Sequence, residues 1–98
     1  MSARLLGRSG ALTGIDVPIA DRVRIGSGAD VDLKIDAPGV LPLHATISRD
    51  GDRVVLAAER SDAAGATWLN GRRISSEALQ HLDVITVGRG VDLIYLAT

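Results

Sequence analysis

Short stretches of alternating apolar and polar residues, separated by turn signals, run through the whole chain. Residues 31–35, with the sequence VDLKI, alternate strictly, as a half-buried β-strand does. Asp50-Gly51 and Asn70-Gly71 each stand between two such stretches, and both dipeptides are typical of two-residue type I′ hairpin turns. Many short strands with regular turns and little helix predict an antiparallel β-sandwich or barrel.

Two segments depart from simple alternation. Pro18 has no N–H to donate, so the strand that contains it should lie at a sheet edge or break there. Residues 75–82 contain good helix formers after a serine that could cap a helix, but they are too few for a stable one. We expect a loop there with at most one helical turn, anchored by Leu79 and Leu82. The expected strands cover residues 4–6, 15–19, 23–25, 31–35, 45–48, 54–57, 67–69, 73–74, 84–87 and 91–96.

At 98 residues the chain is predicted to form one small domain with a single core. Aromatic residues make up only 2% and Phe is absent, so the core must consist of Val, Leu, Ile and Ala. Trp68, beside a hairpin turn, is either a core aromatic or an exposed anchor. The net charge of -1, with acids and bases interspersed, gives no electrostatic footprint for nucleic acid or an anionic membrane.

The composition also limits the compartment and the chemistry. Without cysteine there is neither a disulfide framework nor a thiolate metal site. No apolar run approaches the length of a membrane span, and the N-terminus lacks a secretory h-region. We therefore expect a cytoplasmic domain with no cofactor, no metal and no membrane contact of its own.

The most informative part of the chain is residues 24–47. A tight Gly26-Ser27-Gly28 turn precedes the alternating strand, and a loop with two prolines and a glycine, residues 37–43, follows it and ends at His44. Two loops flanking one strand are a common way to build a binding edge on a rigid scaffold. The glycine turn either cradles an anion with its N–H groups or is a plain tight turn. His44 is expected to be a structural histidine that ties one loop to another.

In chain order, IGS, DVDLKI, VLPLHA, TWLNGRRI and LDVITVG resemble the motifs of the forkhead-associated (FHA) domain. The resemblance covers nearly the whole chain. It implies an antiparallel β-sandwich of about eleven short strands with little or no helix, a count that belongs to the family fold. It also implies binding of phosphothreonine peptides through loops at one end of the sandwich.

The residues with which that family holds the phosphopeptide are replaced here. The arginine of the Gly-Arg motif is replaced by Ser27. The serine of Ser-Arg-x-His is replaced by Leu41, and only His44 of that motif matches. The asparagine of Asn-Gly-Thr, which holds the peptide backbone, is replaced by Gly65, and of that motif only Thr67 matches. The scaffold residues of the family are thus retained and its ligand residues are not.

The binding affinity that is lost with these three groups can be estimated. A charge-assisted hydrogen bond contributes about 1.5–3 kcal/mol. Losing two of the three groups would cost about 3–5 kcal/mol, on the order of a hundredfold to a thousandfold or more in affinity. Leu41 beside a dianion adds a desolvation penalty. We therefore predict a non-catalytic, phosphate-independent protein-interaction module that is part of a larger assembly, such as a secretion or signalling complex.

A narrower resemblance points the same way. The IGS turn and the Gly39-Val40-x-Pro42-x-His44 pattern are similar to degenerate FHA domains in the cytoplasmic N-terminal part of type III secretion inner-ring proteins. This implies that the chain is a domain excised from a longer, membrane-anchored protein. The partner would be a peptide loop or a folded domain, and self-association is a further option.

The alternative function is a phosphothreonine-peptide-binding signalling domain with a rearranged site, in which Arg24, Arg72 or Arg73 replaces the missing arginine. Catalysis has no support, because the sequence shows no nucleophile–base set, no metal-ligand spacing and no nucleotide loop.

We expect the partner to dock on an apolar ridge over residues 40–43, where the family places phosphate-binding residues. Stiff apolar groups lose little entropy on docking, and small polar residues around them would form a rim. Folding rather than binding is expected of Gly26, His44, Asn70 and Gly71. The predicted partner-binding residues are Ser27, Gly28, Leu41, Pro42, Leu43, Gly65, Ala66 and Thr67.

Overall fold

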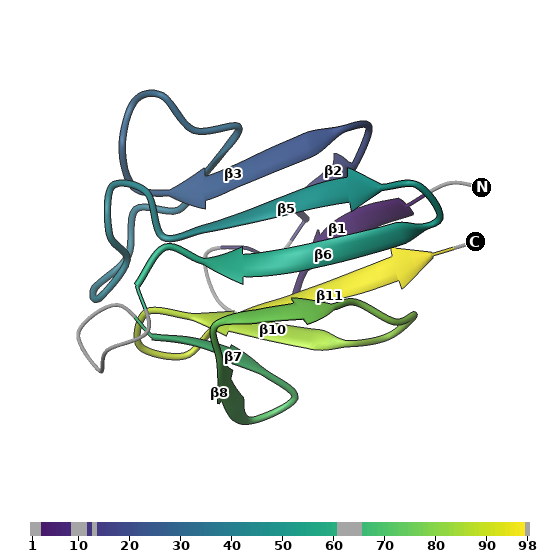
Figure 1. Cartoon of the computed structure of the whole chain (residues 1–98). Helices are drawn as coiled ribbons and strands as arrows, with labels where there is room; N and C mark the ends of the chain where they lie inside the picture. Colours follow the sequence, from purple (N-terminus) through teal and green to yellow (C-terminus); the bar gives the residue numbers. More distant parts are fainter. Residues whose placement is uncertain (1–2, 9–11, 13, 61–65, 98) are drawn as a thin grey trace.

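The computed structural model describes residues 3–8, 12, 14–60 and 66–97. Its strands form two β-sheets that pack face to face (Figure 1), and none of the described residues lies in an α-helix. The predicted all-β sandwich is therefore confirmed. The strands are β1 Ala3–Gly7, β2 Asp16–Pro18, β3 Arg22–Gly26, β4 Leu33–Lys34, β5 Ala45–Asp50, β6 Arg53–Ala58, β7 Thr67–Leu69, β8 Arg72–Ile74, β9 Ser76–Ala78, β10 Val84–Val87 and β11 Val91–Ala97.

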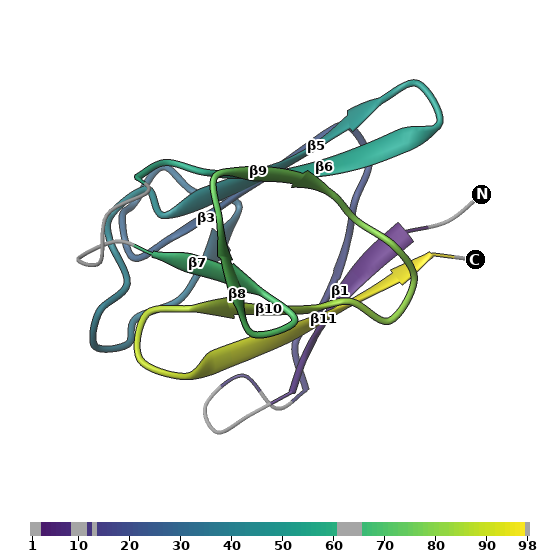
Figure 2. The ribbon, with the colours of Figure 1, turned by 60° about the horizontal axis from the view of Figure 1, so that its bottom comes forward.

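Sheet A has the strand order β2-β1-β11-β10-β7-β8, and sheet B has the order β4-β3-β5-β6-β9. Figure 2 shows the two sheets on opposite sides of the interior, with β5, β6 and β9 facing β1, β10 and β11. All neighbouring strands are antiparallel except β3 and β4. β2 lies at the edge of sheet A, where the missing N–H of Pro18 leaves no ladder bond unmade.

Inward-facing side chains of both sheets meet in one aliphatic core. Successive side chains of a strand point to opposite faces, so alternate residues are buried. Leu5, Ile47 and Leu93 are fully enclosed, and Tyr95 adds one aromatic ring to a core that otherwise has the predicted composition. The buried polar residues among those described are His44 and Thr67.

The predicted Asn70-Gly71 hairpin turn is confirmed. Leu69 pairs with Arg72, and both central residues have positive φ, 52° and 85°, as a type I′ turn requires. The other predicted turn is shifted by one residue. Asp50 itself pairs with Arg53, so the two-residue turn is Gly51-Asp52, and only Gly51 has positive φ, as in a type II′ turn.

The strand expected over residues 31–35 is shorter than predicted, and it is parallel to its neighbour. Only Leu33–Lys34 pairs with β3, although Leu33 and Ile35 are buried as the alternation predicted. The reason is Asp32, whose carboxylate accepts the Arg24 N–H at 2.9 Å. A side chain thus takes the donor that a longer strand would have used.

The expectation for residues 75–82 is wrong in two ways. Ser76–Ala78 forms β9, which pairs with β6 and closes the edge of sheet B, instead of a helical turn. Leu79 does anchor the segment and is buried, but Leu82 is 60% exposed with a φ of 76°. Pairing with β6 supplies backbone hydrogen bonds that one turn of helix could not match.

The two ends of the sandwich differ. The connections β3–β4, β4–β5 and β10–β11 gather at one end, which we call the loop end, and the chain termini emerge at the other (Figure 1). The loop end is the one at which sequence reasoning placed the binding residues.

Candidate functional site

The glycine turn at the start of the β3–β4 loop is bonded to the β4–β5 loop. The Ser27 N–H donates to the Leu41 carbonyl at 2.9 Å, and the Gly28 N–H donates to the Pro42 carbonyl at 3.1 Å. The Ser27 hydroxyl donates to the Val40 carbonyl at 3.1 Å. These donors are satisfied within the protein, so they are not available to cradle an anion.

His44, fully buried, joins the β4–β5 loop to Ala66 in the β6–β7 connection. Its Nδ1 accepts the Leu41 N–H at 3.2 Å, so the ring proton resides on Nε2, which donates to the Ala66 carbonyl at 2.9 Å. Its own N–H donates to the Ile25 carbonyl at 2.8 Å. Because the ring is buried and both nitrogens are occupied, His44 positions backbone rather than offering a group to a ligand.

Gly26 lets the two loops approach each other. A Cβ at this position would lie 2.1 Å from the Pro42 carbonyl oxygen, which is main chain and cannot rotate away. Gly28 is less restricted, because a Cβ there would lie 3.0 Å from the same oxygen. The glycine spacing of the turn therefore follows from close packing against residue 42.

The β10–β11 turn supports the same loops from sheet A. The Arg89 N–H donates to the Pro38 carbonyl at 3.2 Å, and Gly88 lies against the Val40 side chain. Val40 is buried in the core, so it is not part of an exposed ridge. What remains outside is Leu41, Pro42 and Leu43, of which Pro42 is exposed and the two leucines are half-buried; we call these three residues the 41–43 ridge.

A hollow of about 330 Å³ lies beside the 41–43 ridge. Its walls are mostly apolar, with Arg24 and Asp30 as the charged groups. The Arg24 guanidinium is shared with Asp32, at 3.5 Å from Nε to Oδ2. The Arg24 N–H, helped by that guanidinium, holds the pKa of the Asp32 carboxyl below its usual value. The lining residues are Arg24, Gly28, Ala29, Asp30, Val31, Pro42 and Leu43.

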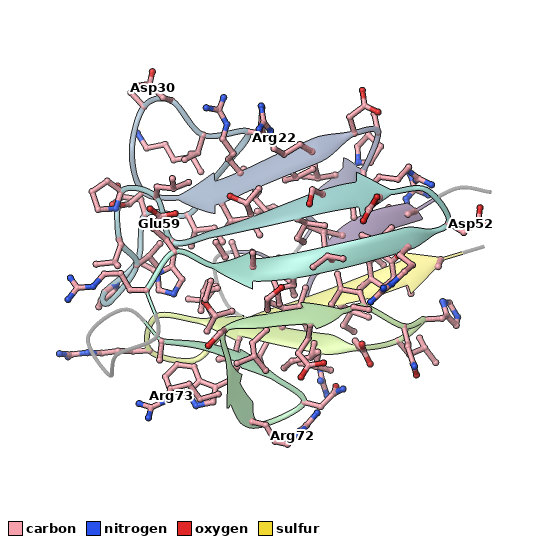
Figure 3. The ribbon with its side chains drawn as sticks, in the orientation of Figure 1. Arg22, Asp30, Asp52, Glu59, Arg72 and Arg73 are labelled. Atoms are coloured by element: carbon pink, nitrogen blue, oxygen red, sulfur yellow. The ribbon has the colours of Figure 1, made fainter. Side chains whose placement is uncertain are left out.

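The three candidate arginines do not gather at one place. Arg24 is on β3 in sheet B, whereas Arg72 and Arg73 are on β8 in sheet A. Figure 3 shows Arg72 and Arg73 on the far side of the molecule from Asp30, which lies in the same loop as Ser27. Of the three, only Arg24 borders the hollow at the loop end.

Ala66 and Thr67, the described candidates at the start of β7, offer little accessible chemistry. Thr67 is fully buried, and its hydroxyl has no hydrogen-bond partner. Ala66 is buried as well and offers its carbonyl to His44. Gly65, the third candidate in this connection, lies outside the described residues.

Asp83 organises a second polar cluster, which sequence reasoning missed. Its carboxylate accepts the Gln80 N–H at 2.8 Å and the Asn70 amide at 3.0 Å, and the Asn70 side-chain oxygen accepts the Val84 N–H at 2.9 Å. Asn70 therefore braces the β9–β10 turn in addition to shaping its own hairpin. The sequence did contain a signal for this cluster. Asp83 lies three residues after Gln80, and Asp side chains often accept hydrogen bonds from nearby backbone N–H groups.

Among the residues that the structure describes, no group of three His, Asp or Glu side chains could hold a metal ion. Within the same residues, no helix has the length and apolar character needed to span a bilayer.

The comparisons agree with the fold. A family model for the FHA domain matches residues 23–88. The domain solved in a structural and functional analysis of phosphothreonine-dependent FHA domain interactions is 25% identical, with a TM-score of 0.88 over 100% of this chain and 98% of that chain. The FhaA FHA domain complexed with the intracellular domain of Rv3910 is 26% identical. Its TM-score is 0.83, and the match covers 96% of this chain and 99% of that chain.

The FHA domain of CT664 from Chlamydia trachomatis shares the fold at 18% identity, with a TM-score of 0.87 over 100% of this chain and 99% of that chain. A search of curated protein sequences finds no match. The family model covers more than half of the chain, and its boundaries span β3 to the β10–β11 turn. The chain therefore belongs to the FHA domain family, whose members are protein–protein interaction modules.

Proposed function

We propose that this domain is a non-catalytic interaction module that binds a protein partner at its loop end without requiring phosphate. The observation that carries the proposal is the internal use of the loop-end donors. The Ser27 hydroxyl and N–H and the Gly28 N–H donate to carbonyls of the β4–β5 loop, and the His44 Nε2–H donates to the Ala66 carbonyl. A phosphate group would have to break these bonds before it could gain its own.

Electrostatics argue against a phosphate in the adjacent hollow. Arg24 is the cation that borders it, but Asp32 already shares that guanidinium and Asp30 lines the same hollow. A phosphothreonine dianion would approach two carboxylates for one arginine. Like charges at close range oppose binding.

The surface favours a partner with apolar side chains. Leu41, Pro42 and Leu43 flank walls formed by Ala29 and Val31. The loops beneath are fixed by main-chain bonds, so little conformational entropy is lost when a partner docks. We infer that the partner inserts a short aliphatic side chain into the hollow and covers the 41–43 ridge.

One solved relative supports a folded protein as the type of partner. The FhaA FHA domain, 26% identical to this chain, is complexed with the intracellular domain of another protein. By this comparison we propose a protein domain or loop as the partner, and a cytoplasmic assembly such as a secretion or signalling complex as the setting.

The direct test is a fluorescence-anisotropy titration with a library of phosphothreonine peptides and their unphosphorylated twins. We expect no phosphate-dependent binding with a Kd below about 10 µM, corresponding to roughly −7 kcal/mol. A phosphorylated peptide that binds at or below about 1 µM while its twin does not bind would instead establish the rearranged phosphopeptide site, with Arg24 as the residue to replace first.

The docking surface is tested with Leu41→Ser/Leu43→Ser. Both side chains are half-buried and neither belongs to the core cluster, so the melting temperature should fall by only a few degrees. Binders selected from an unphosphorylated peptide library against the wild-type domain should lose affinity for this variant. If the variant unfolds, the leucines are packing residues; if it stays folded and binds every selected peptide normally, the partner docks elsewhere.

A further inference from the structure

The four edge strands of the sandwich differ in how readily they could pair with another strand. Sheet A ends at β2 and β8, and sheet B ends at β4 and β9. An edge strand presents unpaired N–H and C=O groups, which can bond to the edge of a second copy. Whether two edges pair depends on which main-chain groups point outward and on which side chains lie beside them.

Three of these edges offer few main-chain groups. In β2, the ladder with β1 turns residue 18 outward, and Pro18 has no N–H to offer there. β4 comprises only Leu33–Lys34. In β8, the ladder with β7 turns only Arg73 outward, so a second copy paired symmetrically at this residue would set arginine against arginine.

The hydrogen bonds between β6 and β9 show which groups of β9 are used inside the sheet. The Ala58 N–H donates to the Ser75 carbonyl at 2.8 Å, and the Leu79 N–H donates to the Val54 carbonyl at 2.7 Å. Hydrogen-bonded pairs alternate along an antiparallel ladder. The main-chain groups of residues 75, 77 and 79 therefore point toward β6, and those of residues 76 and 78 point away from it.

β9 is thus the edge whose backbone is best prepared for pairing. Ser76 and Ala78 each turn one N–H and one C=O outward, and Figure 2 shows β9 at the border of sheet B, beside β6. In the part of the chain that the structure describes, no group bonds to these outward donors and acceptors. Neither side chain is large enough to cover them.

Glu77 lies between these two residues, and its side chain is on the face of sheet B that looks toward sheet A. It is paired with Leu56, which is fully buried, and directly opposite residues have their side chains on the same face. Leu79, two residues further on, is buried on this face, whereas Glu77 is exposed. A charged side chain that points inward on an edge strand opposes pairing with another edge.

Two β9 strands have one symmetric antiparallel register that uses all the outward groups. In this register Ser76 of each copy bonds to Ala78 of the other, and Glu77 lies directly opposite Glu77 of the second copy. This central pair is not hydrogen-bonded, so its Cα atoms would be only about 4.5 Å apart and its side chains would be close together. Two carboxylates in that position repel each other.

We propose that Glu77 prevents the domain from joining a second copy through β9. A neutral residue at this position removes the repulsion and leaves the outward groups of Ser76 and Ala78 free to pair. The neighbouring outer face gives no other barrier, since Val55 and Ala57 are the residues opposite Ala78 and Ser76. This role is separate from partner binding, because β9 contributes no residue to the hollow at the loop end.

The test compares the wild-type domain with Glu77→Thr by sedimentation velocity from about 10 µM to about 1 mM. Threonine removes the charge and suits a β-strand. We expect the wild type to be monomeric up to about 1 mM and Glu77→Thr to dimerise with a Kd of about 100 µM or lower, at least about tenfold tighter. A variant that stays monomeric over this range, or a wild type that dimerises as tightly as the variant, would overturn the proposal.

Charge exchange isolates the repulsion at the centre of the register. Glu77→Lys alone should be monomeric, because lysine then lies opposite lysine. An equal mixture of Glu77→Lys and wild type should form a heterodimer, because lysine then lies opposite Glu77. The matched control is Glu59→Lys, which makes the same charge change at an exposed residue outside the strands and should not associate with wild type. Association of both mixtures alike, or of neither, would contradict the proposal.

A second substitution shows whether the variant associates through β9. Ala78→Pro removes an outward N–H and no bond to β6, so Glu77→Thr/Ala78→Pro should be folded and monomeric. A folded double variant that dimerises as tightly as Glu77→Thr would overturn the proposal. If the double variant does not fold, hydrogen exchange of Glu77→Thr decides instead. The Ser76 and Ala78 amides should become protected at high concentration, and unchanged exchange in the dimer would place the contact elsewhere.

Discussion

Two polar clusters fix the turns of this domain, and they differ in their exposure to water. At the loop end, His44 is fully buried and bonds the backbone of its own β4–β5 loop at Leu41 and of the β6–β7 connection at Ala66. The second cluster joins Asn70 to Asp83 and the β9–β10 turn, and its hydrogen bonds are exposed. Water can replace a partner lost from the second cluster, but it cannot reach the first.

This difference explains how a binding end can keep its shape after changing its chemistry. The buried His44 ring ties the β4–β5 loop to Ala66 through groups that point inward, so the outward residues of the β4–β5 loop take no part in this bonding. Leu41 therefore occupies the position of the serine in the Ser-Arg-x-His motif without disturbing the His44 ring, which bonds only its main-chain N–H. Substitutions of His44, Gly26, Asn70 and Thr67 test this comparison.

The largest effect is expected from His44→Ala. The substitution leaves the Leu41 N–H and the Ala66 carbonyl unpartnered in a buried cavity. Each unsatisfied group costs about 1–3 kcal/mol, so the free energy of unfolding should fall by about 3–5 kcal/mol. Urea unfolding measures it. A loss below about 1 kcal/mol would mean that the ring does not hold the loops together.

Gly26→Ala should have the next largest effect, because the new methyl group meets the Pro42 main chain. Moving the loop to relieve the contact should cost about 2–3 kcal/mol. Gly28→Ala is the matched control, since its Cβ would be 3.0 Å from the same oxygen and a small shift relieves it. Equal losses for the two variants in thermal or urea unfolding would contradict close packing at Gly26.

Substitutions of Asn70 should cost less, although its side chain makes two hydrogen bonds, as the His44 side chain does. Asn70→Gly keeps the positive φ and removes both side-chain bonds, and we expect a loss of about 1 kcal/mol, or roughly 4–8 °C in melting temperature. Asn70→Ala should lose a further amount of about 1 kcal/mol, because alanine is strained at this φ. If Asn70→Gly lowered the free energy of unfolding as much as His44→Ala does, the exposed cluster would be as important for stability as the buried one, which would contradict this comparison.

The smallest effect, and one of opposite sign, is expected from Thr67→Val. The Thr67 hydroxyl is buried without a partner, and valine has nearly the same shape. The free energy of unfolding should stay constant or rise by up to about 1 kcal/mol. Thermal unfolding decides this, and a clear decrease would show that the hydroxyl is bonded in solution.

The sequence predicted the fold well where local signals decided it. Alternation located the strands, the Asn70-Gly71 dipeptide located a hairpin, and Pro18 marked an edge strand. These features depend on backbone geometry within a few residues, which single residue types reveal directly.

Tertiary partners decided the features that were predicted wrongly. Ser76–Ala78 became a strand because the edge of β6 was open to it, although the local residues favoured a helical turn. Strand β4 is short because the Asp32 carboxylate competes for the Arg24 N–H. Val40 is buried beneath the β10–β11 turn, which no local pattern indicates. The predicted 40–43 ridge was therefore one residue too long.

The central claim is that the loop end accepts a protein without phosphate, and an NMR titration tests it most directly. The isotope-labelled domain is titrated with a pool of phosphothreonine peptides and then with the same pool after phosphatase treatment. We expect the Ser27, Gly28 and Leu43 amides to respond equally, or not at all, to the two pools. Saturable shifts at these amides with the phosphorylated pool alone would contradict the claim.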